Sequence, residues 1–185
     1  ATYFVVSGSP KWISSTGTSG RPALMHVGTS QFYHNANYGG NHNQPYIFFC
    51  VLQSTNATAG AGNQAAYFSN FGGPSVAFYP SVSAGSMQAY SSTAATFPFP
   101  YTITNTTVLT VYVNGASTWI RTNGALAGTI SGNAGTAPFH QSLIIGTDTG
   151  GGSPIEGYMY ELMGYEFGSM TTNQIQTIEN ALKAK

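Results

Sequence analysis

Charged residues are scarce in this 185-residue chain, where only 5% of residues are Asp, Glu, Lys or Arg against a usual figure of about 25%. The five basic and five acidic residues cancel. A nucleic-acid-binding protein needs a basic stripe against the phosphates, and an interfacial membrane helix needs a basic amphipathic face. These residues can build neither, so we expect no nucleic-acid partner and no membrane insertion.

Cysteine is almost absent, since Cys50 stands alone. No internal disulfide can form, and no pair of Cys-x-x-Cys motifs exists to hold zinc. Cys50 lies within the apolar run Ile-Phe-Phe-Cys-Val, which predicts a core thiol. The chain also lacks a long apolar run and a basic leader, so we expect neither a transmembrane span nor a signal peptide. It opens without Met, and we expect either a trimmed N-terminus or a piece of a longer protein.

Turn residues, in contrast, are plentiful: 23 Gly and 9 Pro divide the chain into short β-branched and aromatic runs. The spacing of these runs predicts one all-β domain over residues 1–185, an antiparallel sandwich of two sheets. The glycine-rich piece at 149–154 is interpreted as a loop. The predicted strands are 2–6, 22–27, 45–54, 65–71, 75–79, 86–91, 106–113, 117–121, 127–131, 142–146 and 155–167.

One short α-helix is predicted at the C-terminal end, over about 172–184. Thr171 and Gln174 have the spacing of a capping box. Basic residues in the last turn suit the helix dipole. Apolar residues recur at i, i+3 and i+7, so the helix should lie against the sheet through one stripe: Ile175, Ile178 and Leu182.

The stretch 111–124 contains two Asn-Gly pairs, which predict two tight hairpin turns of type I′. The short strand between them carries Trp119 and Arg121 on one face and Ile120 on the other. If Ile120 points to the core, Trp119 and Arg121 look outward and form a contact surface for a ligand or subunit. Core or interface packing is the alternative for the tryptophan.

The C-terminal block, residues 157–185, resembles the end of the laminin-G-like and concanavalin A-like lectin/glucanase modules of bacterial surface and phage virion proteins. Those modules close with a strand of pattern G-x-I-x-E followed by two hydrophobic residues, x and Tyr. A Leu/Met-Ser/Thr turn and a helix ending in Leu-x-x-Lys come next. Here the strand positions are filled by Gly157, Met159, Glu161, Leu162, Met163 and Tyr165, the turn by Met170 and Thr171, and the helix end by Leu182 and Lys185.

The central hairpin and the run 142–146 are also similar to that family, and the resemblance extends from Gln44 onward. It implies a jelly-roll form of the sandwich and an extracellular or virion-surface location. It does not imply one activity, because this fold carries lectins, glycanases, adhesins and structural domains.

Catalysis is not expected, and we assign no catalytic residue. The glucanase branch of the resembled fold uses paired carboxylates in a pattern like E-x-D-x-x-E, which this chain lacks. Glu156 and Glu166 share a strand face but lie about 33 Å apart, whereas glycoside hydrolysis needs about 5–9.5 Å. Glu161, on the face of Met159 and Met163, is interpreted as a structural acid. A Gly-x-Ser-x-Gly nucleophile turn is also missing.

Metal binding has two candidate positions. Lectin-type jelly rolls often hold Ca²⁺ at the sheet rim, and Asp148 within the glycine-rich loop could contribute, although one carboxylate gives weak affinity. A plain loop is the alternative. His34 and His42 could be transition-metal ligands, with exposed loop histidines as the alternative. No other cofactor is expected.

The residues 31–45 form the main candidate binding stretch, because Asn, Gln, His and Tyr dominate it and no apolar periodicity is present. Aromatic faces and amide groups together suit sugars. A polar connection satisfied by water or by a neighbouring subunit is the alternative. Trp12 offers a further stacking platform. The candidate residues for carbohydrate or partner binding are Tyr33, His34, Asn37, Tyr38, His42, Trp12, Trp119 and Arg121.

The sequence therefore favours a non-catalytic, lectin-like surface module, with adhesion or decoration of a phage virion or cell-surface assembly as its role. Glycans or a cell surface are the expected ligands. The low charge also suits permanent packing against neighbours, because near-zero net charge removes repulsion, and we expect a homo-oligomer or a larger assembly. A purely structural assembly protein without a ligand is the alternative, and a polysaccharide-cleaving enzyme is a remote one.

Overall fold

Two antiparallel sheets and one helix make up the part of the chain that the computed structural model describes. The described residues are 5–7, 11–13, 22–26, 32–35, 42–54, 68–69, 76–80, 87–91, 94–97, 105–127, 131–139, 143–145, 157–166 and 170–185. No helix among these residues is long and apolar enough to cross a membrane.

One sheet has seven strands in the order β12-β11-β10-β5-β15-β3-β2. Its centre is formed by the long strands β10, β5 and β15, which pair along nearly their whole length. The strands are β2 (Lys11–Ile13), β3 (Ala23–His26), β5 (Tyr46–Ser54), β10 (Thr107–Val113), β11 (Trp119–Thr122), β12 (Ala125–Leu126) and β15 (Gly157–Glu166).

The other sheet has eight short strands in the order β1-β4-β14-β6-β7-β8-β9-β13. Its strands are β1 (Val5–Ser7), β4 (Phe32–Asn35), β6 (Phe68–Ser69), β7 (Val76–Pro80), β8 (Met87–Ser91), β9 (Ala94–Phe97), β13 (Ser131–Gly132) and β14 (Leu143–Ile145). The non-sequential strand orders of both sheets create the crossed connections of a jelly roll. The predicted two-sheet sandwich with one C-terminal helix is confirmed.

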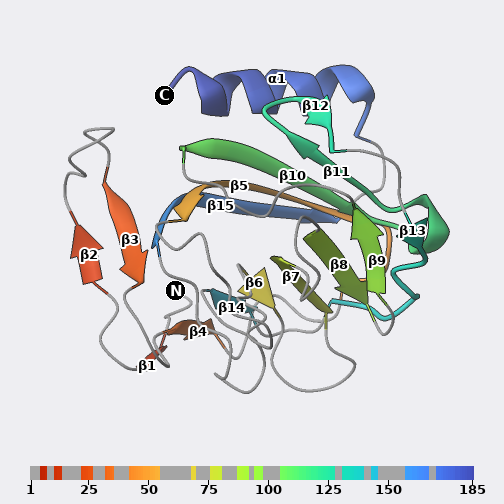
Figure 1. The fold of residues 1–185 in the computed structure, drawn as a ribbon, viewed down its shortest axis with the longest axis horizontal. Coiled ribbons are helices and arrows are strands. Elements are labelled where there is room, and N and C mark those ends of the chain that lie inside the picture. Colours follow the sequence, from red (N-terminus) through yellow and green to blue (C-terminus); the bar gives the residue numbers. More distant parts are fainter. Residues whose placement is uncertain are drawn as a thin grey trace.

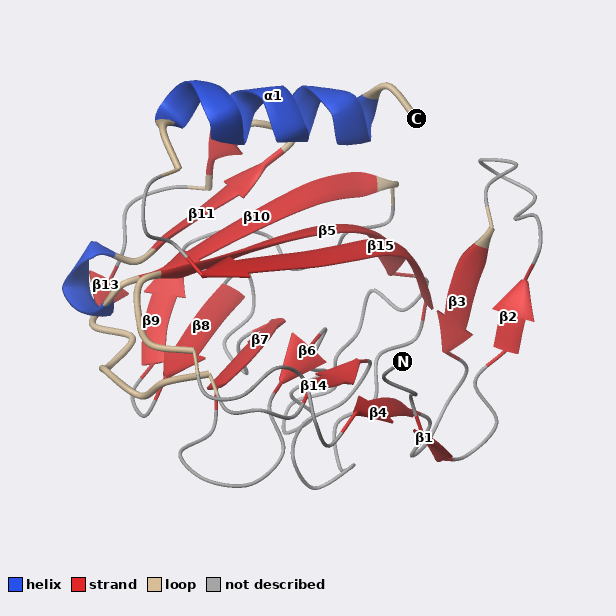
Figure 2. Ribbon diagram, turned by 180° about the vertical axis from the view of Figure 1, so that it is seen from behind, coloured by secondary structure: helices blue, strands red, loops and turns tan. Residues whose placement is uncertain are grey.

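The described residues form three layers, with the helix α1 (Thr172–Lys183) on the outer side of the seven-stranded sheet and the eight-stranded sheet on the inner side (Figures 1 and 2). Strand β5 lies between the other two layers, and its residues Tyr46 to Leu52 are at most 4% exposed. A strand covered on both faces needs apolar residues on both, which explains its unbroken hydrophobic run.

Alternation along the strands separates two sets of core side chains. On the outer side, Ile47, Phe49 and Val51 of β5 pack with Val108 of β10 beneath the helix. On the inner side, residues of the opposite parity face the second sheet, where the Phe48 and Phe139 rings lie 5.1 Å apart. The sheet is therefore buried on both faces at its centre.

The helix α1 begins and packs as the sequence predicts. Thr171 is its N-cap, and the capping box with Gln174 is complete. Ile175 and Leu182 are buried against the sheet, and Ile178 packs beside them. A third buried residue on this face, Glu179, was not predicted.

The two Asn-Gly pairs differ in structure. At Asn123-Gly124 both residues have positive φ, +50° and +85°, and the turn joins β11 to β12 directly, so the type I′ prediction is confirmed. At Asn114-Gly115 the prediction is wrong. Asn114 has φ −156°, and the connection is a five-residue loop containing the 3₁₀ turn η1 (Gly115–Ser117).

Other predictions of local structure need correction. Strands β2, β4 and β9 were not predicted, and of the expected strand 127–131 only Ser131 lies in a described strand. A bulge in β15 between Met159 and Glu161 shifts the register. Met159 therefore faces the inner core, and Glu161 shares its outer face with Met163 but not with Met159. The glycine-rich piece 149–154 lies outside the described residues.

Candidate functional site

Gln44 holds three loops together at one end of the seven-stranded sheet. Its side-chain amide donates to the carbonyls of Gly135 at 3.1 Å and Ala137 at 3.0 Å. Its side-chain carbonyl accepts a hydrogen bond from the Gly115 N–H at 2.8 Å. The half-buried Gln44 thus joins the segment before β5, the η1 loop and the segment 133–139, which we call the Gln44 platform (residues 42–45, 114–118 and 133–139).

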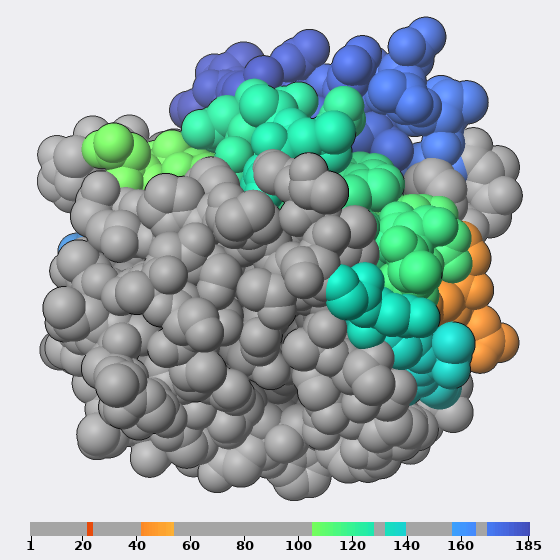
Figure 3. All heavy atoms as spheres, turned by 45° about the vertical axis from the view of Figure 1, so that its right-hand side comes forward, coloured from red at the N-terminus to blue at the C-terminus, as the bar shows by residue number. Residues whose placement is uncertain are grey.

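Backbone contacts make the Gln44 platform more rigid. His42 and Phe139 exchange two backbone hydrogen bonds of 2.7 and 2.8 Å. The Thr118 hydroxyl donates to the Gly115 carbonyl and accepts from the Asn114 N–H. Gly115 has φ +52°, which favours glycine, and a Cβ there would lie 3.4 Å from Asn133 Oδ1. The space-filling view shows segments of the platform side by side (Figure 3: residues 42–54 orange, about 115 green, 132–139 cyan).

The outer surface of the Gln44 platform presents amide and hydroxyl groups. Asn43, Ser117, Asn133 and Thr136 are exposed, and His42 is half-buried. Asn133 Oδ1 accepts the Gly135 N–H at 2.8 Å, which fixes that amide. Neutral hydrogen-bonding groups on a rigid backbone suit a neutral polar ligand, since little conformational entropy is lost on binding.

The structure places the predicted binding residues in different locations. Tyr33 and His34 lie on strand β4, which pairs with β1 and β14, so the interpretation of the whole stretch as a loop is wrong there. His42 is part of the Gln44 platform. Asn37 and Tyr38 lie outside the described residues, and Trp12 is on the edge strand β2.

Trp119 and Arg121 share one face of β11, as predicted, but that face does not look outward. Ile120 points to the core at 0% exposure, and the opposite face is covered by helix α1. The Trp119 ring stacks on Tyr112 with centroids 5.1 Å apart, and the Arg121 guanidinium lies 5.5 Å from the Trp119 ring centroid. The helix packs on this face because its apolar stripe and the outer apolar residues of the sheet bury each other.

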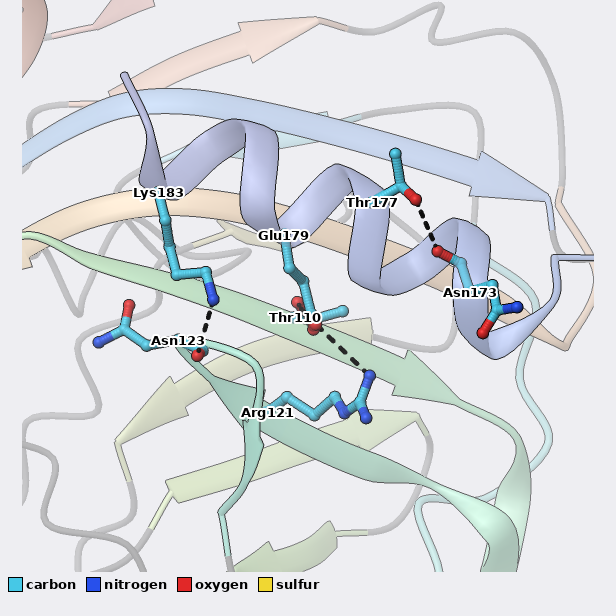
Figure 4. A network of polar contacts seen from close by, with 7 residues as sticks. All are labelled: Thr110, Arg121, Asn123, Asn173, Thr177, Glu179 and Lys183. Atoms are coloured by element: carbon cyan, nitrogen blue, oxygen red, sulfur yellow. Dashed lines mark hydrogen bonds and ion pairs between the residues drawn. The ribbon is translucent and has the colours of Figure 1, made fainter.

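Glu179 connects the helix to this covered face. The Thr110 hydroxyl donates to Glu179 Oε1 at 2.8 Å, and Arg121 Nη1 lies 3.4 Å from Oε2 (Figure 4). The side chains of Arg121 and Glu179 are 15% and 1% exposed. A buried charge needs a partner and hydrogen bonds, and here both are supplied. The arginine therefore has a structural contact, and a role of Trp119 and Arg121 in ligand binding stays a prediction.

The described residues contain no group of three or more His, Cys, Asp or Glu side chains arranged to hold a metal ion. Asp148, the calcium candidate, lies outside them. His34 and His42 lie on different segments, β4 and the Gln44 platform. Burial raises the pKa of the Cys50 thiol above its ordinary value, because an apolar core disfavours the thiolate. The prediction that Cys50 is a core residue is confirmed.

Glu161 forms an ion pair with Lys185, whose Nζ lies 2.9 and 3.0 Å from the two carboxylate oxygens. The pair links the end of α1 to β15. Glu161 and Glu179 thus both contact basic side chains. Their arrangement joins the helix to the sheet.

Two residues of structural importance, Gln44 and Glu179, were not identified from the sequence. Glu179 follows Ile175 by four positions and precedes Leu182 by three, so an acid on the apolar stripe was a usable signal. No comparable signal marks Gln44, because its partners lie 71 to 93 positions away in sequence.

Solved structures with the same fold come from different functional settings. Domain 4 of AbnA, an extracellular GH43 arabinanase from Geobacillus stearothermophilus solved with arabinotriose, aligns with a TM-score of 0.66 and 16% identity over 93% of this chain and 82% of that chain. The receptor-binding domain of botulinum neurotoxin D aligns with a TM-score of 0.69 and 8% identity over 98% of this chain. A heptameric SAP-like pentraxin from Limulus polyphemus aligns with a TM-score of 0.55 and 13% identity over 80% of this chain and 75% of that chain.

These similarities, all at 16% identity or below, show a jelly-roll sandwich fold and no family. This chain spans 48% of the neurotoxin domain, about half its length. No protein-family profile and no curated protein sequence matches the chain.

Proposed function

We propose that this chain is a non-catalytic, lectin-like module that binds neutral glycans through the Gln44 platform. The observation that carries the proposal is the platform itself. Gln44 fixes three loops by three hydrogen bonds, and the fixed loops present exposed amides and hydroxyls beside the half-buried His42. Sugars are bound by such groups, and a prearranged set lowers the entropic cost of binding.

The comparisons support the proposal by analogy of fold. The arabinanase domain was solved with arabinotriose, a neutral sugar. A neurotoxin domain of the same fold was solved with N-acetylneuraminic acid, which is acidic and supports sugar binding by this fold but not the preference for neutral glycans. The near-neutral, polar composition of this chain suits an uncharged ligand. We further propose an extracellular or virion-surface setting and a role in adhesion or decoration, which rest on the sequence resemblance.

The absence of catalysis is part of the proposal. Glu161 and Glu179 contact Lys185 and Arg121 respectively, and a glycoside hydrolase needs two carboxyls facing one cleft. Incubation with plant and bacterial polysaccharides should release no reducing ends. Release of reducing ends that is lost in a Glu161→Gln variant would contradict this part.

A glycan array tests the binding function directly. The purified chain should bind at least one class of neutral glycan, and an Asn43→Ala, Asn133→Ala double variant should lose that signal. Asn180→Ala, an exposed amide on the far side of α1, is the matched control and should bind normally. A wild-type chain that binds no glycan would contradict the proposal.

Assembly without a ligand is the second candidate function, and one observation favours it. Leu126 is 65% exposed on β12, the edge strand of the seven-stranded sheet. Exposed apolar residues on a sheet edge favour pairing with another copy. Sedimentation of the wild type and of a Leu126→Lys variant tests this candidate, which requires self-association that the variant loses.

A further inference from the structure

A pocket of about 250 Å³ lies between the C-terminal turn of α1 and the sheet, remote from the Gln44 platform. Its apolar lining consists of the core residues Val51, Val108 and Leu182, which are at most 3% exposed. Thr106, Asn123, Lys183 and Lys185 add polar groups. The volume lies below the range of about 300–1,000 Å³ for drug-sized ligands, so the pocket suits a ligand as small as one sugar ring.

Two of the polar groups of this pocket are ammonium groups, which only donate hydrogen bonds. It holds two of the five basic residues of the whole chain. Lys183 Nζ makes a long contact of 3.4 Å with the Asn123 carbonyl (Figure 4), which leaves donor capacity on the ammonium group. Lys185 is 56% exposed and pairs with Glu161, which is 26% exposed. Such exposed pairs are weak, so Lys185 can also turn to an incoming anion.

The acidic groups around the pocket are already engaged. Glu161 contacts Lys185, and the buried Glu179 contacts Arg121 and Thr110. The carbonyl end of the helix adds partial negative charge, which the lysines offset. The balance therefore favours a ligand with one carboxylate over a highly charged one.

A tyrosine pair lies on the same outer face, one strand beyond the pocket. The Tyr158 and Tyr160 rings are 6.3 Å apart and half-buried, and the Tyr160 hydroxyl donates to Gln53 Oε1 at 3.1 Å. Gln53 follows Val51 by two positions on β5, which is about 7 Å. The bulge in β15 places Tyr160 beside Glu161 on this face.

We propose that this pocket is a second binding site, which takes a sugar that carries a carboxylate. Lys183 and Lys185 bind the carboxylate, Thr106 and Asn123 contact the ring hydroxyls, and the Tyr158–Tyr160 pair stacks on the adjoining sugar unit. The site goes beyond the neutral-glycan function of the Gln44 platform and does not depend on it.

Calorimetric titration with sodium D-glucuronate, and with D-glucose as the uncharged match, tests the proposal. Glucuronate should bind about tenfold more tightly than glucose because of the charge-assisted contacts, and added salt should weaken it. A Lys183→Gln, Lys185→Gln double variant should lose this preference. Equal binding of the two sugars, or an unchanged preference in the variant, would overturn the site.

Two further measurements test whether the double variant is folded and whether the tyrosine pair contacts the ligand. The double variant should unfold at the same urea concentration as the wild type, because both lysines are exposed. A correctly folded variant makes its binding result decisive. With a hyaluronan tetrasaccharide, Tyr158→Ala should weaken binding several-fold and leave glucuronate binding unchanged, and equal affinity would overturn the stacking role. Loss of glycan binding in the Asn43, Asn133 variant with glucuronate binding intact separates the two sites.

Discussion

At the scale of single residues, Glu179 carries the connection between helix α1 and the sheet. Replacing it with alanine should lower the free energy of unfolding by about 2–4 kcal/mol. The Arg121 guanidinium would stay largely buried without its carboxylate, and the Thr110 hydroxyl would lose its acceptor. Urea denaturation measures the loss.

Glu161→Ala is the matched control for this prediction. It also removes a carboxylate that contacts a basic side chain, but the pair is exposed, so the expected loss is about 1 kcal/mol or less. Equal losses for the two variants would contradict the importance assigned to burial of Glu179.

Cys50 gives a pH-dependent prediction at the same scale. Burial raises the pKa of the Cys50 thiol in the folded chain, whereas the same thiol in the unfolded chain ionises at about pH 8.5. Below that pH both states keep the proton and the contribution to stability is complete. Above it the unfolded chain alone releases a proton, so stability falls by about 1.4 kcal/mol per pH unit.

The comparison with Cys50→Ala isolates this effect from other titrating groups. The difference in unfolding free energy between wild type and variant, measured from pH 7 to 10, should be constant up to about pH 8.5 and then shift against the wild type. A constant difference over the whole range would show that the thiol is not buried.

At the scale of secondary-structure elements, the start of α1 depends on its cap. Thr171→Ala removes the hydroxyl that accepts the Gln174 N–H and should cost about 1 kcal/mol of unfolding free energy. Thr177→Ala is the control on the same helix, since its hydroxyl only bonds back to the Asn173 carbonyl (Figure 4). That change should cost nothing, because alanine is the better helix former, and a loss equal to that of Thr171→Ala would contradict the role of the cap.

The turn between β11 and β12 depends on a glycine with positive φ. Gly124 has φ +85°, and a Cβ there would lie at an ordinary 3.5 Å from its nearest neighbours. Gly124→Ala should therefore cost about 1–2 kcal/mol through backbone strain alone. Asn123→Asp keeps the acceptor for the Val108 N–H and a residue that tolerates positive φ, so thermal unfolding should change little; a Gly124→Ala variant as stable as Asn123→Asp would contradict the strain.

Elements that are determined by residues close together in sequence can be predicted from the sequence. The cap and stripe of α1 and the apolar run of β5 lie within a few residues, so the sequence pattern predicts both. The first Asn-Gly pair forms a longer loop because Gln44 and Thr118 bind Gly115. The short strand β4 pairs with β14, where Asn35 lies opposite Leu143, and no local pattern contains a partner so distant in sequence.

At the scale of the whole molecule, turn spacing predicts a two-sheet β sandwich and the family resemblance implies its jelly-roll form, whereas neither locates the sites. The Gln44 platform joins segments about 71 to 93 positions apart. Helix α1 packs against the face that carries Trp119 and Arg121, and its Glu179 lies 58 positions after Arg121. The site that we propose lies instead in the loops before β5 and after β10, and a binding role of Trp119 and Arg121 stays a prediction.

The central claim is that these loops bind glycans, and a ¹H–¹⁵N NMR titration tests it most directly. The ligand is the strongest neutral glycan from the array, added to the ¹⁵N-labelled wild-type chain. Saturable shifts should concentrate on backbone amides of His42, Asn43, Ser117, Asn133 and Thr136, with those of α1 unchanged. Shifts confined to other surfaces, or none at any concentration, would contradict the account.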